Sequence, residues 1–323
     1  MNIKLMLKNN PVTKGVYNKL KTANDNRKRN NQFKYTGYFD NRSSGEEVLC
    51  VVLAGYKEYL YDEVFGRLEK YLSPRIDVCI VSSGKNSRTL SEICKKNNWS
   101  YLSTKENNVS LVQNVAIKLH PKAKYIFKLD EDIFITEGYF DKMLNAYKHS
   151  ENAYYKTGFL APVIPLNGFT HYLVLEKLGL IEDYARRFER PVIMAGNQRM
   201  IQSSLEVAKY FWGNDNVVPS IDELNKMFSA DPIEECLCPV RFSIGAILFK
   251  REFWENMGYF KVDLSINAMG MDETQICEYC MRVSRPIVIS KNVVVGHFSF
   301  GPQTAGMIDY FNANHERFVV KNG

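Results

Sequence analysis

The sequence predicts an α/β fold with a mostly parallel sheet that is flanked by helices. Between about residues 48 and 134, short apolar runs rich in β-branched residues alternate with segments whose apolar residues recur at helical spacing. The connections between them are short, as in sheets whose strands are joined by crossover helices. The 323 residues are 45% hydrophobic and 24% charged, which is typical of soluble globular proteins and excludes a disordered or fibrous chain.

The first half of the predicted sheet has the clearest alternation. Helical spacing in residues 57–72 places Tyr61, Val64 and Phe65 on one face, and Pro74 ends this helix. The predicted strands are residues 47–55, 77–81, 101–103 and 124–129, and the predicted helices are residues 57–72, 88–98 and 110–119.

The second half is less regular. We expect helices near residues 173–188 and 203–212, followed by a long loop at 213–239 that contains Gly, Asn, Asp and Pro. From residue 240 the alternation returns. We expect a strand at 242–249, helices at 251–257 and 272–282, and strands at 286–289 and 292–295.

The basic charge is concentrated at the N-terminus. Residues 1–45 contain ten Lys or Arg and two Asp, so this segment carries +8 while the whole chain carries +6. We interpret residues 1–45 as a mobile basic arm, which could touch an anionic membrane surface, although a solvated tail would have the same composition. The rest of the chain is nearly neutral, which argues against nucleic acid as the main partner.

Cysteine content and hydropathy indicate the cellular compartment in which we expect the protein. Seven Cys in 323 residues are too few for a disulfide scaffold. No apolar run reaches the roughly 18–20 residues that span a bilayer, and the first 30 residues contain no apolar segment of the secretory type. We expect a cytoplasmic protein, with peripheral contact to the inner face of a membrane through the basic arm.

Polar residues follow three of the predicted strands: Ala-Gly-Tyr at 54–56, Ser-Ser-Gly at 82–84 and Asp-Glu-Asp at 130–132. Because the carboxyl ends of parallel strands meet at one edge of a sheet, ligands bind at that edge. Two carboxylates there, Asp130 and Asp132, can hold a divalent cation that keeps positions open for phosphate oxygens. The alternative is an ordinary solvated acidic turn.

Residues 107–114 (Asn-Asn-Val-Ser-Leu-Val-Gln-Asn) form the Asn-rich start of a predicted helix, and residues 125–132 form a strand that ends in the acidic triplet. Residues 245–260 form a strand and a helix, and Gly-Met-Asp-Glu at 270–273 is a second acidic motif. In this order the four segments resemble the Asn-rich helix start, the metal-binding strand, the acceptor-side strand and helix, and the acidic catalytic motif of glycosyltransferases of GT-A (Rossmann-like) fold, most closely family 2.

The resemblance implies a metal-dependent, inverting transfer of a sugar from a nucleotide-diphospho-sugar, UDP-linked by default. The acceptor would be a hydroxyl of a glycan or of a lipid-linked glycan, as in polysaccharide biosynthesis. Residues 46–150 would bind the nucleotide-sugar, and residues 151–323 would bind the acceptor, with specificity carried by the irregular middle. Mn²⁺ or Mg²⁺ would be held by Asp132 together with Asp130 and His297. The donor would contact Ala54, Tyr56, Ser82, Ser83, Asn114, Asp130 and Glu131.

One departure from the family concerns the nucleobase. The family usually has an acidic residue after the second strand to bind the base, where this chain has Ser82, Ser83 and Gly84. The base would then be contacted by a hydroxyl, by Asp77 or by the backbone.

The acidic pair at 272–273 supplies the candidate catalytic base. In an inverting transfer the acceptor hydroxyl attacks the anomeric carbon opposite the leaving diphosphate, and a carboxylate takes its proton. Asp272 is the first candidate and Glu273 the second, although both could instead stabilise the start of a helix. His297 could likewise be a structural side chain at a strand end. Trp212 and Trp254 are candidates for stacking on a sugar in the acceptor cleft.

Three alternatives stay open at this point. A tetrahedral zinc site could use two close pairs of thiolates, although buried apolar cysteines would explain them too: Cys236, Cys238, Cys277 and Cys280. A sugar-phosphate nucleotidyltransferase would share the sheet and the acidic site, but residues 54–60 hold only one Gly and one Lys where that class has a Gly-rich basic loop. A non-catalytic glycan-binding module on a transferase-like scaffold would bind a sugar nucleotide without turnover.

Overall fold

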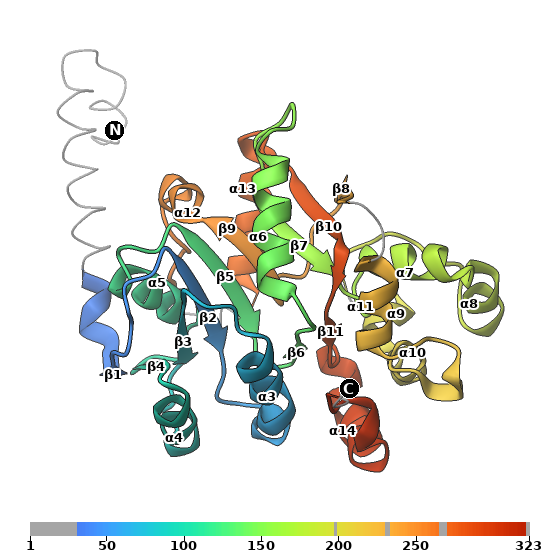
Figure 1. The fold of residues 1–323 in the computed structure, drawn as a ribbon, viewed down its shortest axis with the longest axis horizontal. Helices are drawn as coiled ribbons and strands as arrows, with labels where there is room; N and C mark the ends of the chain where they lie inside the picture. Colours follow the sequence, from blue (N-terminus) through green and yellow to red (C-terminus); the bar gives the residue numbers. More distant parts are fainter. Residues whose placement is uncertain (1–30, 197–198, 230–232, 265–269, 321–323) are drawn as a thin grey trace, which may run out of the picture.

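Nine strands form one sheet through the centre of the protein, within the residues that the computed structural model describes, 31–196, 199–229, 233–264 and 270–320 (Figure 1). In spatial order the strands are β1 (Thr36–Asp40), β4 (Ser100–Thr104), β3 (Ile76–Ser82), β2 (Val48–Leu53), β5 (Tyr125–Asp130), β9 (Ala246–Lys250), β7 (Phe159–Val163), β10 (Ile287–Val294) and β8 (Glu235–Leu237). β1, β9 and β8 run against the direction of the others. The predicted α/β fold with a mostly parallel, helix-flanked sheet is therefore confirmed.

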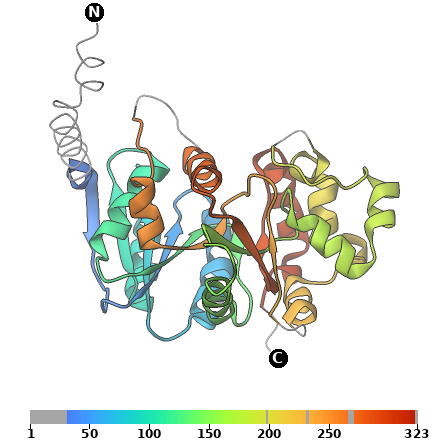
Figure 2. The ribbon, with the colours of Figure 1, turned by 90° about the horizontal axis from the view of Figure 1, so that it is seen from above.

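Helices connect the strands and cover the sheet. They are α3 (Tyr61–Tyr71), α4 (Arg88–Asn97), α5 (Val109–Leu119), α6 (Tyr139–Ser150), α7 (Thr170–Leu178), α8 (Ile181–Arg187), α9 (Met200–Ser203), α10 (Leu205–Phe211), α11 (Ile221–Ser229), α12 (Arg251–Met257), α13 (Met271–Arg282) and α14 (Thr304–Ala313). Short 3₁₀ turns are η1 (Asn31–Tyr35), η2 (Glu58–Leu60), η3 (Asn214–Asn216), η4 (Gly301–Gln303) and η5 (His315–Arg317). Figure 2 shows α12 and α13 on the opposite side of the sheet from α3 and α6. Among the described residues, no helix has both the length and the apolar character needed to cross a bilayer.

The first half of the sheet follows the predicted order. β2, β3, β4 and β5 are mutually parallel and are joined by α3, α4 and α5. Side chains cap the starts of two of these helices: Ser87 accepts a hydrogen bond from the amide of Leu90, and Asn108 accepts one from the amide of Leu111. The four strands therefore end at one edge of the sheet, where their polar exits come together.

The middle of the chain differs from the prediction at two helices. The segment at 173–188 is not one helix, because Gly179 takes the left-handed conformation (φ +67°) and ends α7, and α8 begins two residues later. The segment at 203–212 is also divided, since α9 ends at Ser203 and α10 begins at Leu205.

The predicted long loop at 213–239 is wrong, because it contains α11 and β8. Ile221, Leu224 and Phe228 form a buried face of α11, which packs against β10. Ser220 precedes this helix and exchanges hydrogen bonds with Glu223 in a capping box, which is a signal that the sequence contains. β8 pairs antiparallel with β10 at the edge of the sheet.

Two strand predictions also change. The expected strands at 286–289 and 292–295 form the single strand β10, which pairs with both β7 and β8. β9 begins at Ala246, later than the predicted start at 242, and it lies antiparallel between β5 and β7.

Residues 31–45, assigned to the basic arm from composition, belong to the body of the protein in the structure. β1 pairs antiparallel with β4 and forms one edge of the sheet. Asp77 holds the turn that follows, because its carboxylate accepts hydrogen bonds from the amides of Ser44 (2.8 Å), Gly45 (3.0 Å) and Glu46 (3.0 Å). The rest of the arm, residues 1–30, lies outside the described residues.

A second, two-stranded sheet lies beside the end of β5. β6 (Ile133–Phe134) pairs antiparallel with β11 (Gly296–His297), with His297 opposite Ile133. Trp212 supports this pair, because its ring packs on Gly296 and its Nε1–H donates to the carbonyls of His297 and Phe298 (both 3.1 Å). The pairing brings the C-terminal segment next to the acidic end of β5.

Candidate active site

A cavity of about 360 Å³ lies at the carboxyl ends of β2 and β5, between the two halves of the chain. Polar and charged side chains contribute much of its lining. Nine residues that the sequence singles out line it: Ala54, Tyr56, Ser83, Asp130, Glu131, Asp132, Asp272, Glu273 and His297. The structure thus brings together the acidic strand end, the acidic start of α13 and the C-terminal histidine, which are far apart in the sequence.

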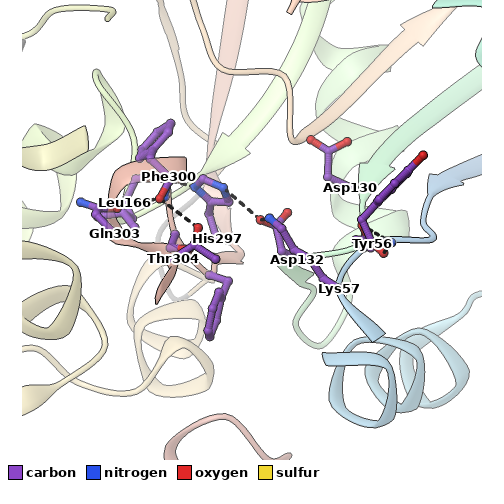
Figure 3. A network of polar contacts seen from close by, with 12 residues as sticks. Tyr56, Lys57, Asp130, Asp132, Leu166, His297, Phe300, Gln303 and Thr304 are labelled. Carbon is purple, nitrogen blue, oxygen red and sulfur yellow. Dashed lines mark hydrogen bonds and ion pairs between the residues drawn. The ribbon is translucent and has the colours of Figure 1, made fainter. Parts of the chain in front are cut away.

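Asp132 is the most strongly paired carboxylate of the cavity. Its Oδ2 forms an ion pair with Lys57 and lies 3.5 Å from Nε2 of His297 (Figure 3). Burial alone would raise the pKa of Asp132, but the positive charges of His297 and Lys57 outweigh it and hold this pKa well below its usual range. Burial alone would lower the pKa of Lys57, but the carboxylates of Asp132 and Asp130 outweigh it and raise this pKa. Both partners are therefore charged at neutral pH.

His297 faces Asp132 in a fixed orientation. Its Nδ1 lies 3.3 Å from the carbonyl oxygen of Leu166, and the ring of Phe300 packs edge-on against it. A carbonyl oxygen can only accept, so Nδ1 carries the proton of this hydrogen bond. Nε2 is then the ring atom that faces the Asp132 carboxylate, and either a proton or a metal ion can lie between the two.

Asp130 points in a different direction from Asp132 (Figure 3). Its Oδ1 lies 2.6 Å from Nζ of Lys128, and Lys128 also donates to the carbonyl of Ile244 (2.8 Å). Burial raises the pKa of Asp130 although Lys128 opposes the shift, and the carboxylates of Asp132 and Asp272 add to the increase.

Glu131 binds the protein backbone. Its carboxylate accepts hydrogen bonds from the amide of Gly55 (2.7 Å) and from the amide of Tyr56 (3.0 and 3.1 Å), and the hydroxyl of Tyr61 donates to it at 3.3 Å. The side chain is buried. Glu131 therefore fixes the loop after β2, and this role differs from the direct donor contact that the sequence suggested.

The exits of β2 and β3 form the side of the cavity expected to hold the nucleobase. The hydroxyl of Tyr56 donates to the carbonyl of Ser83 (2.6 Å), which joins the two loops. Ser82 points inward, where its hydroxyl donates to the carbonyl of Lys85, and it does not line the cavity. Ser83 is 5% exposed, lines the cavity, and its Oγ has no hydrogen-bond partner among the described residues. Asp77 lies at the other end of β3 and cannot contact a base bound here.

Asp272 and Glu273 line the opposite wall, from the first turn of α13. Oδ2 of Asp272 accepts a hydrogen bond from the amide of Gln113 at 2.8 Å, so this carboxylate has a fixed direction. Oε1 of Glu273 lies 3.3 Å from Nε of Arg241. Burial raises the pKa of Glu273, while Arg241 and Lys128 oppose the shift. The two neighbouring carboxylates therefore have different partners.

Besides Ser82, three further residues that the sequence singled out do not line the cavity. The amide of Asn114 holds the loop after α12, because its Nδ2 donates to the carbonyl of Phe260 (2.8 Å) and its Oδ1 accepts from Trp254 (3.1 Å). Trp254 is fully buried in the core, and Trp212 supports β11. These side chains support the elements that form the walls of the cavity, without lining it themselves.

Sequence reasoning missed three residues that hold the carboxylates: Lys57, Lys128 and Gln113. Lys128 had a visible signal, since a charged residue in a buried strand two positions before Asp130 lies on the same face of the sheet. Lys57 follows the polar exit of β2 by one residue. Gln113 lies in an apolar helix and pairs with Asp272, 159 residues later, so no local pattern identifies it.

The four cysteines considered for zinc lie on β8 or just after it, and on α13. Cys238 and Cys277 have their sulfurs near the backbone carbonyls of Val240 (3.2 Å) and Phe242 (3.6 Å). In the described part of the chain, no group of three or more His, Cys, Asp or Glu side chains is arranged to hold a metal ion. This includes the acidic cavity, where Asp132 and His297 converge and Asp130 stands apart.

No protein-family model and no curated protein matches the chain. Among solved structures, it is similar to the mannosyltransferase PcManGT from Pyrobaculum calidifontis in complex with GDP-Man and Mn²⁺ (12% identity, 84% of this chain and 64% of that one, TM-score 0.46). It is also similar to S. aureus TarS 1-349 (12% identity, 82% and 64%, TM-score 0.44) and to the same protein in complex with UDP (12%, 77% and 60%, TM-score 0.43). The chain thus spans less than two thirds of these proteins.

Proposed function

We propose that the chain is a metal-dependent glycosyltransferase that moves a sugar from a nucleotide-diphospho-sugar to an acceptor hydroxyl with inversion. One observation carries the proposal. A single cavity at the carboxyl edge of the sheet contains a carboxylate–imidazole pair on one wall and the carboxylates of α13 on the other. The first is suited to a cation that neutralises a leaving diphosphate, and the second to removing the acceptor proton.

The donor set on the first wall fits Mn²⁺ or Mg²⁺ with two converging ligands. Asp132 offers a hard oxygen, and His297, whose Nδ1 is directed to the carbonyl of Leu166, offers Nε2 as a nitrogen ligand; these two atoms lie 3.5 Å apart. A bound divalent cation would stabilise the negative charge of the departing diphosphate. Asp130 would serve as a further ligand only after it leaves Lys128.

Asp272 acts as the base in this proposal. The acceptor oxygen bonds to the anomeric carbon, the bond from that carbon to the diphosphate breaks, and the acceptor proton passes to Asp272. Asp272 is preferred to its neighbour because the Glu273 carboxylate is already paired with Arg241. The hydrogen bond from Gln113 directs the Asp272 carboxylate without adding a charge to it.

The donor nucleotide would lie against the exits of β2 and β3. The unpartnered hydroxyl of Ser83 would contact the base or ribose, and Tyr56 would cover it, with UDP as the default nucleotide. A glycan or lipid-linked glycan would approach from the second half of the chain. Peripheral membrane contact of the basic arm stays a prediction, since residues 1–30 lie outside the described residues.

Calorimetry with UDP, GDP, CDP and dTDP, each with and without Mn²⁺, tests the proposal. We expect one nucleotide to bind the wild type tightly only with Mn²⁺, and Asp132→Ala to lower that affinity by about 100-fold or more. Asp141→Ala, which removes an acid on α6 away from the cavity, is the matched control and should bind as the wild type does.

Absence of metal-dependent nucleotide binding in every combination would remove the enzyme proposal. Binding of a sugar nucleotide without turnover on any acceptor would favour the glycan-binding module. Synthesis of the sugar nucleotide from a sugar phosphate would favour the nucleotidyltransferase.

A further inference from the structure

Lys57 is a charged side chain of the cavity with no role in the proposed reaction so far. It lies in the loop between β2 and η2 and reaches Oδ2 of Asp132, the same oxygen that faces His297. Figure 3 shows Lys57 and His297 approaching Asp132 from opposite sides. A divalent cation bound by Asp132 and His297 would therefore meet the ammonium group of Lys57 at close range.

Two positive charges cannot share this oxygen at low cost. Asp132 is 3% exposed, and charges in such a poorly hydrated place repel strongly. Cation binding would thus displace the Lys57 ammonium from Asp132. The Asp130 carboxylate is already paired with Lys128, and Glu131 is occupied by the backbone of the β2 loop. The displaced ammonium needs a new anionic partner.

The charge balance of the cavity points to that partner. Five carboxylates line the cavity, and the lysines that line it among the described residues are Lys57 and Lys128. Lys128 is 3% exposed and held by two contacts, whereas the side chain of Lys57 is 28% exposed and comes from a loop. Lys57 is the lysine that can move to a ligand, and a diphosphate is the anion that would reach the cavity together with the cation.

We propose that Lys57 exchanges partners during donor binding: it pairs with Asp132 in the free protein and with the donor diphosphate once a divalent cation occupies Asp132 and His297. The inference rests on the proposed function, because it assumes a diphosphate donor. Before the donor binds, the divalent cation and the Lys57 ammonium compete for the carboxylate of Asp132. Once the donor is bound, both of them contact its diphosphate.

The exchange predicts two effects of opposite sign for Lys57→Gln. Mn²⁺ alone, titrated by electron paramagnetic resonance, should bind the variant about tenfold more tightly than the wild type, since its competitor is gone. UDP, titrated by calorimetry at saturating Mn²⁺, should bind the variant about tenfold more weakly, since a phosphate contact is gone. If another nucleoside diphosphate binds the wild type best, it replaces UDP as the probe. Lys96→Gln removes a lysine that pairs with Glu69 outside the cavity and should change neither affinity.

Each outcome of these titrations either supports or overturns the proposed exchange of partners by Lys57. An unchanged or weaker Mn²⁺ affinity in Lys57→Gln overturns the exchange, and so does tighter Mn²⁺ binding with an unchanged affinity for the nucleotide. Lys57→Arg keeps the charge and should keep both wild-type affinities. A nucleotide affinity that falls as far in Lys57→Arg as in Lys57→Gln would show that the charge of this residue does not bind the diphosphate, and would overturn the proposal. A wild type that binds Mn²⁺ but no nucleoside diphosphate would contradict the proposed function itself, and with it the exchange.

Discussion

The two walls of the cavity hold their carboxylates with different kinds of partner. On the wall formed by the end of β5, Asp132 is paired with Lys57 and faces His297. On the wall formed by α13, Asp272 accepts a hydrogen bond from the neutral amide of Gln113. Both carboxylates are buried, so in each case the partner side chain must offset the free-energy cost of removing the carboxylate from water.

The difference shows how two sets of acids in one cavity acquire the different properties that their proposed roles require. Cationic partners hold the pKa of Asp132 low, so this carboxylate stays ionised and suits a metal ion. A neutral amide fixes the direction of Asp272 without placing a positive charge beside it, which suits a group that must accept a proton. Glu273 lies between these cases, because burial raises its pKa while Arg241 occupies its carboxylate.

The largest effect that tests this division is expected from Asp272→Asn. The asparagine keeps the shape and can still accept from Gln113, but it cannot take the acceptor proton. We expect the rate of sugar transfer to fall by about 10²–10⁴-fold, with donor affinity near that of the wild type. Steady-state transfer assays and calorimetry with the donor nucleotide measure the two quantities.

Glu273→Gln is the matched control for this prediction. It removes a carboxylate from the same helical turn and should retain most of the transfer activity. The opposite pattern, an active Asp272→Asn and an inactive Glu273→Gln, would move the base to Glu273 and break the distinction between the charged and neutral partners.

Gln113→Leu tests the proposed role of the neutral partner of Asp272, with a smaller expected effect. The leucine removes the hydrogen bond that directs Asp272 and leaves the charge of the cavity unchanged. We expect kcat to fall by about 10- to 100-fold with little change in KM for the donor, because a misdirected base affects the chemical step. In the Asp272→Asn background the same substitution should cost little more, and fully additive losses would show that Gln113 acts in another way.

The parallel half of the sheet could be predicted closely from the sequence. Its strands are short apolar runs with polar exits, and two of its helices begin at capping residues, Ser87 and Asn108. Such patterns are local, and the crossover rule then places all strand ends at one edge. This was enough to predict that Asp130, Asp132 and Ser83 meet in one cavity.

The mixed half could not be predicted as well, because long-range contacts hold it. Asn225 links α11 to β10 and to the loop before α6, since it accepts from the amide of Val294 and donates to the carbonyl of Glu137. Arg251 similarly binds the carbonyls of Ile117 and Ala123, more than 100 residues earlier. No sequence window contains both partners of such contacts.

The same limit applies to the partners of the site residues. The sequence identified Asp130, Asp132 and Asp272 as acidic groups at ends of elements, which is a local property. It did not identify Lys57 or Gln113, whose importance depends on carboxylates 75 and 159 residues away. The positions of the acidic side chains could therefore be predicted from the sequence, but the side chains that pair with them could be identified only from the structure.

Asp77 provides the smallest expected effect and lies outside both walls. Its carboxylate holds the turn at 43–46 through a hydroxyl and three amides, which outweigh its burial and lower its pKa. A lowered pKa in the folded state means that the ionised group stabilises the protein above the unfolded pKa of about 3.9 and loses this effect as the pH falls through the folded pKa. Asp77→Asn should therefore lower the free energy of unfolding by about 1–2 kcal/mol at pH 7, with nucleotide binding unchanged. In urea denaturation the gap to the wild type should narrow as the pH falls from 4 toward 3, and a gap that stays constant over this range would mean that the charge of Asp77 does not hold the turn.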